Sequence, residues 1–373
     1  MPTITFHPLG NADCYRIDLA KGEKLLFDYA DTRSKEDQSD KRIDLPRVLR
    51  EDLTAAKRAD YDVVGFTHLD NDHVCGAAEF FEFTHAAMYQ GEGRIKIREL
   101  WVPAFAITET KNDICEDGKI IQAEARHRLV KGEGVRVFSR PEVLKAWLNA
   151  RGLSLDARRA LITDAGQLVP GWSKEAQGVE FFVHSPFALR QDDNTFIDRN
   201  TNSLVFQATF LADGRESRVL LMADSEHEIL SEIVRITRLH KRDERLEWDL
   251  TKLPHHCSYL SLGPEKGVDK TTPVPSVAWL YEKQGHRRGC IVSTSDPIPK
   301  SGDQIQPPHR QAASYYRDCL DTLAGDFMVT MEHPSVTTPG LLEVRIDGFG
   351  LTVRKPSPAI GVAATTSRAP RAG

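Results

Sequence analysis

The stretch His68-Leu69-Asp70-Asn71-Asp72-His73 places two imidazoles and two carboxylates within six consecutive residues. Residues 61–67, directly before it, are mostly apolar and β-branched, which predicts a short buried strand. Gly76 follows, and residues 77–81 have the composition of a helix start. The four polar side chains are therefore predicted to lie in the loop that leaves a strand end, where a rigid scaffold often presents reactive groups.

This clustering suits metal binding. A divalent cation needs several nitrogen or oxygen ligands, and two adjacent cations need carboxylates to offset their repulsion. His68 and Asp70 are two residues apart and can point the same way, while Asp72 and His73 can serve a neighbouring position. A solvated polar loop, or side chains that cap a helix, is the alternative interpretation. Two residues of each type in so short a stretch favour the metal.

The H-x-D-x-D-H pattern resembles the second motif of the metallo-β-lactamase fold, which is usually H-x-H-x-D-H. An aspartate at the position of Asp70 resembles the ComEC-type branch, the hydrolase domain of DNA-uptake proteins. Other segments resemble that branch in the same order, and the resemblance runs from about residue 3 to residue 355. These segments are 4–17, 25–28, 179–186, 202–205, 220–224, 250–258, 291–293 and 308–309. Ala223 and Cys257 depart from the pattern, since each replaces a glycine.

The resemblance implies an α/β protein with a metallo-β-lactamase-like four-layer αβ/βα sandwich and a helical insertion at about residues 84–178. Alternation of strands and helices in the second half points to the same architecture. The expected strands there are 203–210, 218–222, 249–253 and 289–293, and the expected helices are 225–239 and 311–323. Residues 1–355 would form the hydrolase domain. Residues 356–373 are rich in Pro, Ala, Ser and Thr, so we expect a disordered tail.

The predicted metal ligands lie in the first motif and at later strand ends. They are His68, Asp70, Asp72, His73, His184, Asp224 and His255. Asp224 follows an apolar strand and could bridge two ions, or it could be the N-cap of the helix that starts near residue 225. His184 is either a sixth ligand position or a satisfied core histidine.

The neighbours His255 and His256 follow another apolar strand, where buried imidazoles are costly unless they bind something. We assign His255 to metal, although the sequence leaves the choice between the two open. The predicted catalytic residues are Asp72, His256 and His309. Asp28 is expected to orient a ligand histidine. Cys257 is either a nucleophile or a small residue in place of glycine.

The carboxylate at position 70 makes the site harder, which favours two Mn²⁺ ions over the alternative, Zn²⁺. The predicted function is hydrolysis of phosphodiesters by a two-metal-activated water, as in a DNA or RNA nuclease. A role in DNA processing or in defence is suggested only by analogy with the resembling proteins, because a fold does not determine function. The alternatives are a hydrolase of small-molecule esters, lactones or cyclic nucleotides, and a non-catalytic metal-binding subunit of a larger complex.

Composition is that of a globular protein. The 373 residues are 40% hydrophobic and 28% charged, with a formal net charge of −5 and six cysteines without paired spacing. We expect a reduced cytoplasmic protein that has nucleic acid as its substrate and does not enter a membrane. A protein partner and a homo-oligomer are the two candidate assemblies. The basic stretch 126–140 is either a solvated face or a contact for an anionic substrate.

Overall fold

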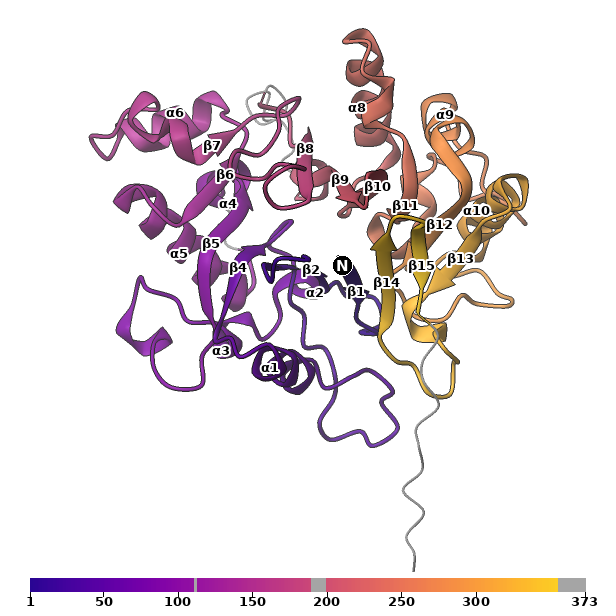
Figure 1. The fold of residues 1–373 in the computed structure, drawn as a ribbon, viewed down its shortest axis with the longest axis horizontal. Helices are drawn as coiled ribbons and strands as arrows, with labels where there is room; N and C mark the ends of the chain where they lie inside the picture. Colours follow the sequence, from indigo (N-terminus) through magenta and orange to yellow (C-terminus); the bar gives the residue numbers. More distant parts are fainter. Residues whose placement is uncertain (111–112, 189–198, 355–373) are drawn as a thin grey trace, which may run out of the picture.

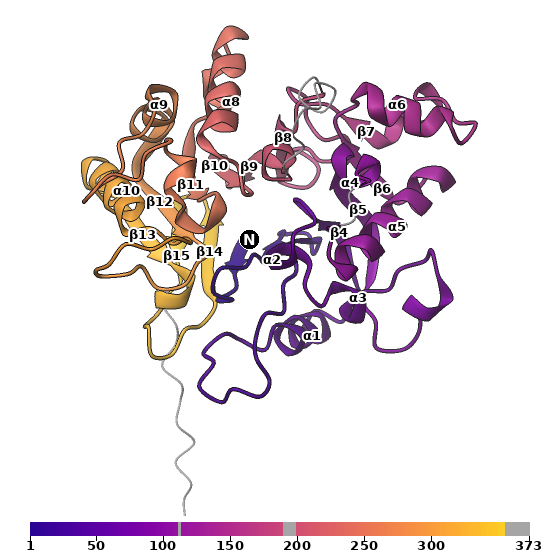
Figure 2. The same ribbon diagram turned by 180° about the vertical axis from the view of Figure 1, so that it is seen from behind.

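The computed structural model describes residues 1–110, 113–188 and 199–354. Two β-sheets pack against each other, and helices cover the outer face of each (Figure 1). The same layering is seen from behind, with α8, α9 and α10 on one flank and α1, α5 and α6 on the other (Figure 2). The tail that the sequence predicts to be disordered, 356–373, lies outside the described residues.

The first sheet has nine strands in the described part of the chain, in the order β15-β14-β1-β2-β3-β4-β5-β6-β7. Strands β3 to β7 run parallel to one another, and β2 pairs with β3 in the antiparallel direction. The bounds are β1 Thr3–Phe6, β2 Tyr15–Asp18, β3 Lys24–Phe27, β4 Asp60–Gly65, β5 Lys96–Pro103, β6 Val135–Phe138, β7 Ile162–Thr163, β14 Leu342–Asp347 and β15 Gly350–Val353.

The second sheet has six strands among the described residues, in the order β13-β12-β11-β10-β9-β8. Strands β10 to β13 are parallel, and β8 and β9 add an antiparallel edge. The bounds are β8 Val179–Ser185, β9 Val205–Ala212, β10 Arg215–Met222, β11 Trp248–Lys252, β12 Gly285–Ser293 and β13 Asp326–Val329.

The helices begin and end at the following residues: α1 Leu45–Ala55, α2 Asn71–Val74, α3 Ala77–Phe80, α4 Ala104–Thr108, α5 Glu116–Lys131, α6 Glu142–Asn149, α8 His227–Leu239, α9 Pro275–Gln284 and α10 Arg310–Leu323. Short 3₁₀ turns are η1 Ala87–Tyr89, η2 Asp156–Leu161, η3 Asn200–Asn202, η4 Asp243–Arg245, η5 His255–Cys257, η6 Tyr259–Ser261 and η7 Thr330–Glu332.

Three apolar cores separate the four layers. One joins the first sheet to α1 and α3–α6, one lies between the sheets, and one joins the second sheet to α8–α10. The middle core is aromatic around Trp101 and Phe206, whose ring centroids are 5.9 Å apart. Each sheet buries both faces, as parallel sheets do. The predicted four-layer αβ/βα sandwich is therefore confirmed.

The segment that the sequence sets apart as a helical insertion, 84–178, is also part of this frame. It contains α4, α5 and α6, and it gives β5, β6 and β7 to the first sheet. The basic stretch within it fits neither sequence interpretation as a whole. Arg128 and Arg136 are buried and pair with Glu124 (2.6 Å) and Glu99 (3.2 Å), so these two arginines support the fold.

Candidate metal centre

The candidate site lies where strands of both sheets end. Strand β4 leads to α2, which carries Asp72 and His73, while β10 leads to Asp224 and β11 leads to His256. Ligand atoms of these four residues all lie within 4.8 Å of one another. The carboxyl ends of parallel strands meet at one edge of a sheet, and such edges commonly hold ligand sites. Here the edges of two packed sheets contribute to one group.

His73 is held by one ring nitrogen and presents the other. Its Nδ1 donates to Asp28 Oδ2 at 2.9 Å, and Asp28 also accepts from the Thr67 amide and hydroxyl, both at 2.7 Å. The Nε2 of His73 faces Asp224 Oδ1 at 3.3 Å. Asp28 adopts a left-handed backbone with φ of 56°. The role predicted for Asp28, orienting a ligand histidine, matches this geometry.

His256 has the same arrangement on the other side. Its Nδ1 donates to the Thr294 carbonyl at 2.7 Å, and its Nε2 faces Asp72 Oδ2 at 3.2 Å and Asp224 Oδ2 at 3.7 Å. The backbone of residues 255–257 has φ values of 48°, 51° and 67°, an uncommon run for non-glycine residues. Such strain clusters at functional sites, where the surrounding structure holds it in place.

His68 and Asp70 lie beside this group. The Thr67 hydroxyl donates to Asp28, so it accepts from His68 Nδ1 at 3.2 Å. That leaves His68 Nε2 bare, buried, and 3.7 Å from Asp70 Oδ2. The rings of His68 and His73 are in contact, with centroids 3.9 Å apart and planes tilted by 50°. The sequence prediction therefore placed His68, Asp70, Asp72, His73 and Asp224 in one neighbourhood.

Buried charge dominates the site. Burial lowers the pKa of His73, but the carboxylates of Asp224, Asp28 and Asp72 raise it by more. The pKa of His73 therefore lies well above the ordinary value. Burial also lowers the pKa of His256, but the attraction of Asp224 and the hydrogen bond that its ring donates to Asp72 outweigh burial, so the net pKa is raised. The Asp224 carboxyl has its pKa held well below its usual range despite burial, because of His73 and His256.

These observations test whether a cation fits. In their neutral forms His68, His73 and His256 each keep a proton on Nδ1, so three bare Nε2 atoms face carboxylates. Among the described residues, Nε2 of His68 and His73 and Oδ1 of Asp224 are buried without a hydrogen-bond partner. Unpaired buried polar atoms are costly. A divalent cation would satisfy them, and a fixed Nδ1 is typical of metal-ligating histidines.

His255 lies at the rim of the group. Its Nε2 is 4.0 Å from Asp224 Oδ2, and its side chain is 21% exposed, against 2% for His256. His256, rather than His255, is among the four residues whose ligand atoms converge. Sequence reasoning could not separate the two, because they are adjacent and the left-handed turn that directs them has no glycine to mark it.

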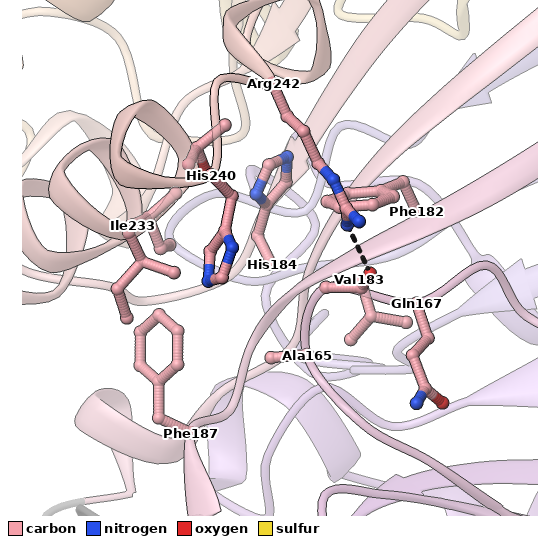
Figure 3. Close-up of a pocket in the computed structure, with 12 residues that line it drawn as sticks. Ala165, Gln167, Phe182, Val183, His184, Phe187, Ile233, His240 and Arg242 are labelled. Carbon is pink, nitrogen blue, oxygen red and sulfur yellow. Dashed lines mark hydrogen bonds between the residues drawn. The ribbon is translucent and has the colours of Figure 1, made fainter.

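His184 is not brought into the group. In β8, residues 179, 181 and 183 face the core between the sheets, so His184 faces the other way. Its Nε2 donates to the Arg245 carbonyl at 2.8 Å, and burial lowers its pKa to about 4. Figure 3 shows the His184 ring beside His240 and Arg242 at a separate cavity of about 320 Å³. This is the geometry of a satisfied histidine.

Both ring nitrogens of His309 have hydrogen-bond partners. Its Nδ1 accepts from the Tyr259 amide at 3.4 Å, and its Nε2 donates to the Ile305 carbonyl at 3.3 Å.

Asp224 is not a helix cap, because the N-cap of α8 is Glu226. Cys257 is fully buried, which raises the pKa of its thiol to about 12. That favours the small packing residue over the nucleophile.

Several residues of the site were not predicted. Asp13 is buried, pairs with Lys252, and lies 3.8 Å from His73 Nδ1. Arg199 donates to Asp70 Oδ1 at 2.7 Å and is held in turn by Glu109. Asp13 lies in the 4–17 segment that carries the resemblance, so position was an available signal. Arg199 and Glu109 had none, because their partners are distant in sequence.

Comparison with known proteins gives the following. No family model matches the chain, and no curated protein does. Among solved structures, the chain is similar to yeast PDE1 in its unliganded form, at 12% identity and TM-score 0.40, over 88% of this chain and 97% of that one. It is similar to a long form RNase Z from yeast at 10% identity and TM-score 0.42, over 88% of this chain and 40% of that one.

A third similar structure is a class B3 di-zinc metallo-β-lactamase, LRA-12, from an Alaskan soil metagenome. It has 11% identity and a TM-score of 0.34, over 86% of this chain and 91% of that one. Likenesses at this level establish no family membership and assign no activity to this chain. The ComEC-type branch stays a prediction. Among the described residues, no helix is long and apolar enough to cross a membrane.

Proposed function

We propose that this protein is a metal-dependent hydrolase that cleaves phosphodiester bonds, with DNA or RNA as the substrate class. One observation carries the proposal. Three buried imidazoles are each fixed through Nδ1 and present Nε2 to carboxylates: His68, His73 and His256. The raised pKa of His73 and of His256 reflects the carboxylates that face Nε2, and a bound cation would take the place of the proton there. His68 has a pKa lowered by burial, so its buried Nε2 faces Asp70 without a proton.

In this proposal Asp72, His73, Asp224 and His256 hold one divalent ion. His68 and Asp70 would supply ligands to a second. The roles proposed from sequence for His255 and His256 are thereby exchanged, and His255, at the rim, is assigned to substrate contact. His184 is left out of both roles because its Nε2 binds the Arg245 carbonyl away from the site. His309 is left out because both of its ring nitrogens have other partners.

The donor set supports a hard ion, and we favour Mn²⁺ with Zn²⁺ as the alternative. Asp70, Asp72 and Asp224 supply oxygen ligands, which Mn²⁺ and Mg²⁺ prefer. When bound, such ions make water more acidic and offset the charge that develops on phosphate oxygens. The chain itself orients the imidazoles through Asp28 and Thr294, and Lys252 neutralises Asp13 behind them. The choice of nucleic acid over a small ester rests on the sequence resemblance.

The proposal is tested with labelled single- and double-stranded DNA and RNA, with Mn²⁺, Mg²⁺, Zn²⁺ or EDTA. Asp72→Asn and Asp224→Asn should abolish cleavage, since each removes a ligand charge while keeping side-chain shape. The matched control is Asp318→Asn, because Asp318 is an exposed aspartate on α10, away from the site. Circular dichroism verifies that each variant is folded.

Metal-dependent cleavage that both site variants lose and the control keeps would support the nuclease. Retained activity in Asp72→Asn or Asp224→Asn would contradict the assigned centre. Cleavage of a small ester, lactone or cyclic nucleotide, with nucleic acids untouched, would replace the substrate class. Bound metal without turnover of any substrate would favour the non-catalytic subunit.

A further inference from the structure

Arg199 connects the candidate metal ligand Asp70 to a buried carboxylate outside the metal centre. It directly precedes η3, and its side chain is 14% exposed. Its Nη1 donates to Asp70 Oδ1 at 2.7 Å. Its Nε and Nη2 donate to Glu109, a side chain that is 1% exposed, at 2.7–3.1 Å, and Nη2 also donates to Asp113 at 2.6 Å. The planar guanidinium offers donors in several directions at once.

The two oxygens of Asp70 consequently have different surroundings. Arg199 holds Oδ1, while Oδ2 faces the bare Nε2 of His68 at 3.7 Å. A carboxylate tied at one oxygen loses its freedom to rotate, so one oxygen remains for a ligand on the His68 side. The guanidinium also offsets the negative charge that Asp70 adds where the resembling family usually has a neutral histidine.

We propose that Arg199 is a positioning residue of the metal centre, which fixes Asp70 as a single-oxygen ligand. The anchor is Glu109, at the C-terminal end of α4, whose buried carboxylate binds the guanidinium through both oxygens. This inference rests on the proposed function only in that Asp70 binds metal; it does not depend on the substrate.

The test is Mn²⁺ binding, measured by calorimetry and by metal analysis of the purified full-length chain. We expect Arg199→Gln to weaken Mn²⁺ binding roughly 10–100-fold, as loss of a residue that orients a ligand typically does. Asp70→Asn should weaken it as well. Adding Arg199→Gln to Asp70→Asn should cause no further loss, because residues that act through one another are not additive.

Two further variants separate positioning from other roles. Arg126→Gln is the matched control, since Arg126 donates to the backbone carbonyls of Ile107 and Glu109 without touching Asp70. It should leave Mn²⁺ affinity unchanged. Arg199→Lys keeps the charge, but one ammonium cannot replace the two-sided contacts, so it should fail to restore affinity.

Arg199→Gln leaves Glu109 buried and unpaired, which could prevent folding. In that case the double variant Arg199→Gln/Glu109→Gln is made, and its Mn²⁺ affinity is compared with that of Glu109→Gln alone. Equal Mn²⁺ affinity in Arg199→Gln and the unaltered chain would overturn the proposal. So would full rescue by lysine, an equal loss in Arg126→Gln, or an unaltered chain that binds no divalent ion. Bound metal without nucleic-acid cleavage would contradict only the substrate assignment, and the affinities would still decide the role of Arg199.

Discussion

At the scale of single residues, Asp28 illustrates how the site depends on one buried carboxylate. It accepts three hydrogen bonds, two from Thr67 and one from His73 Nδ1. Asp28→Asn would place an amide N–H₂ against one of these donors, and the His73 ring would lose its fixed tautomer. We expect Mn²⁺ affinity to fall roughly 10–100-fold, measured by calorimetry.

Asparagine is the informative substitution because it tolerates the left-handed backbone of Asp28, where φ is 56°. Thermal unfolding of the metal-free variant serves as the control for folding. If the variant keeps the Mn²⁺ affinity of the unaltered chain, the hydrogen bond to His73 does not orient a ligand.

Cys257 provides a second prediction at this scale. Its thiol is fully buried and its pKa is raised to about 12 by burial, so almost no thiolate exists near neutral pH. We expect a thiol-alkylating reagent at pH 8 to leave Cys257 unmodified in the native protein and to modify it in denaturant, as read by peptide mass spectrometry. Rapid native modification would reopen the nucleophile interpretation.

The residues of the site were partly predictable. His68, Asp70, Asp72 and His73 could be identified because they lie within six consecutive residues. The choice of His256 over His255 depends on backbone angles, and the engaged ring of His184 depends on the carbonyl of Arg245, 61 residues away. Such long-range partners leave no local pattern.

At the scale of elements, α5 (Glu116–Lys131) shows why the periodicity of apolar residues does not predict every helix. Its buried face carries Gln122, Glu124 and Arg128 beside the apolar row Ile121, Ala125 and Leu129, so polar residues interrupt the apolar pattern. Strongly patterned elements were predicted well: helices α8 and α10, and strands β9 to β12, lie within a few residues of expectation. Tertiary ion pairs, which replace apolar contacts in α5, cannot be foreseen from local composition.

Glu124 carries the stability prediction for this element. It accepts from Arg128 at 2.6 Å, from the Thr84 hydroxyl at 2.9 Å and from the His85 amide at 2.8 Å. Burial raises its pKa, but Arg128 and the hydrogen bonds lower it more, to about 2 against an ordinary 4.5. We expect Glu124→Gln to cost roughly 2 kcal/mol of unfolding free energy at pH 7, measured with urea.

The sign of the pH dependence follows from the lowered pKa. The carboxylate stabilises the fold above the unfolded value, and this contribution is lost as pH falls toward the folded value of about 2. The unfolding free energies of the unaltered chain and of Glu124→Gln should therefore differ most at pH 7. This difference should shrink as pH falls below about 4.5. A difference that grows on acidification would contradict this account.

At the scale of the whole molecule, the two sheets share one core, which fixes the strand ends that carry the site. Phe206 of β9 contacts Trp101, Phe138 and Phe181, with ring centroids 5.1 to 6.3 Å apart. Phe206→Ala should lower the unfolding free energy by about 3–5 kcal/mol. In urea this should appear as a shift of one cooperative unfolding transition to lower denaturant concentration. Separate transitions for the two sheets would contradict a shared core.

The central claim is that Asp72, His73, Asp224 and His256 hold a divalent ion. The most direct test is anomalous diffraction from crystals grown with Mn²⁺. The account predicts a manganese peak at coordination distance from Nε2 of His73 and His256 and from the carboxylates of Asp72 and Asp224. A peak coordinated by His255 in place of His256, or no peak among these side chains in well-ordered crystals, would contradict it.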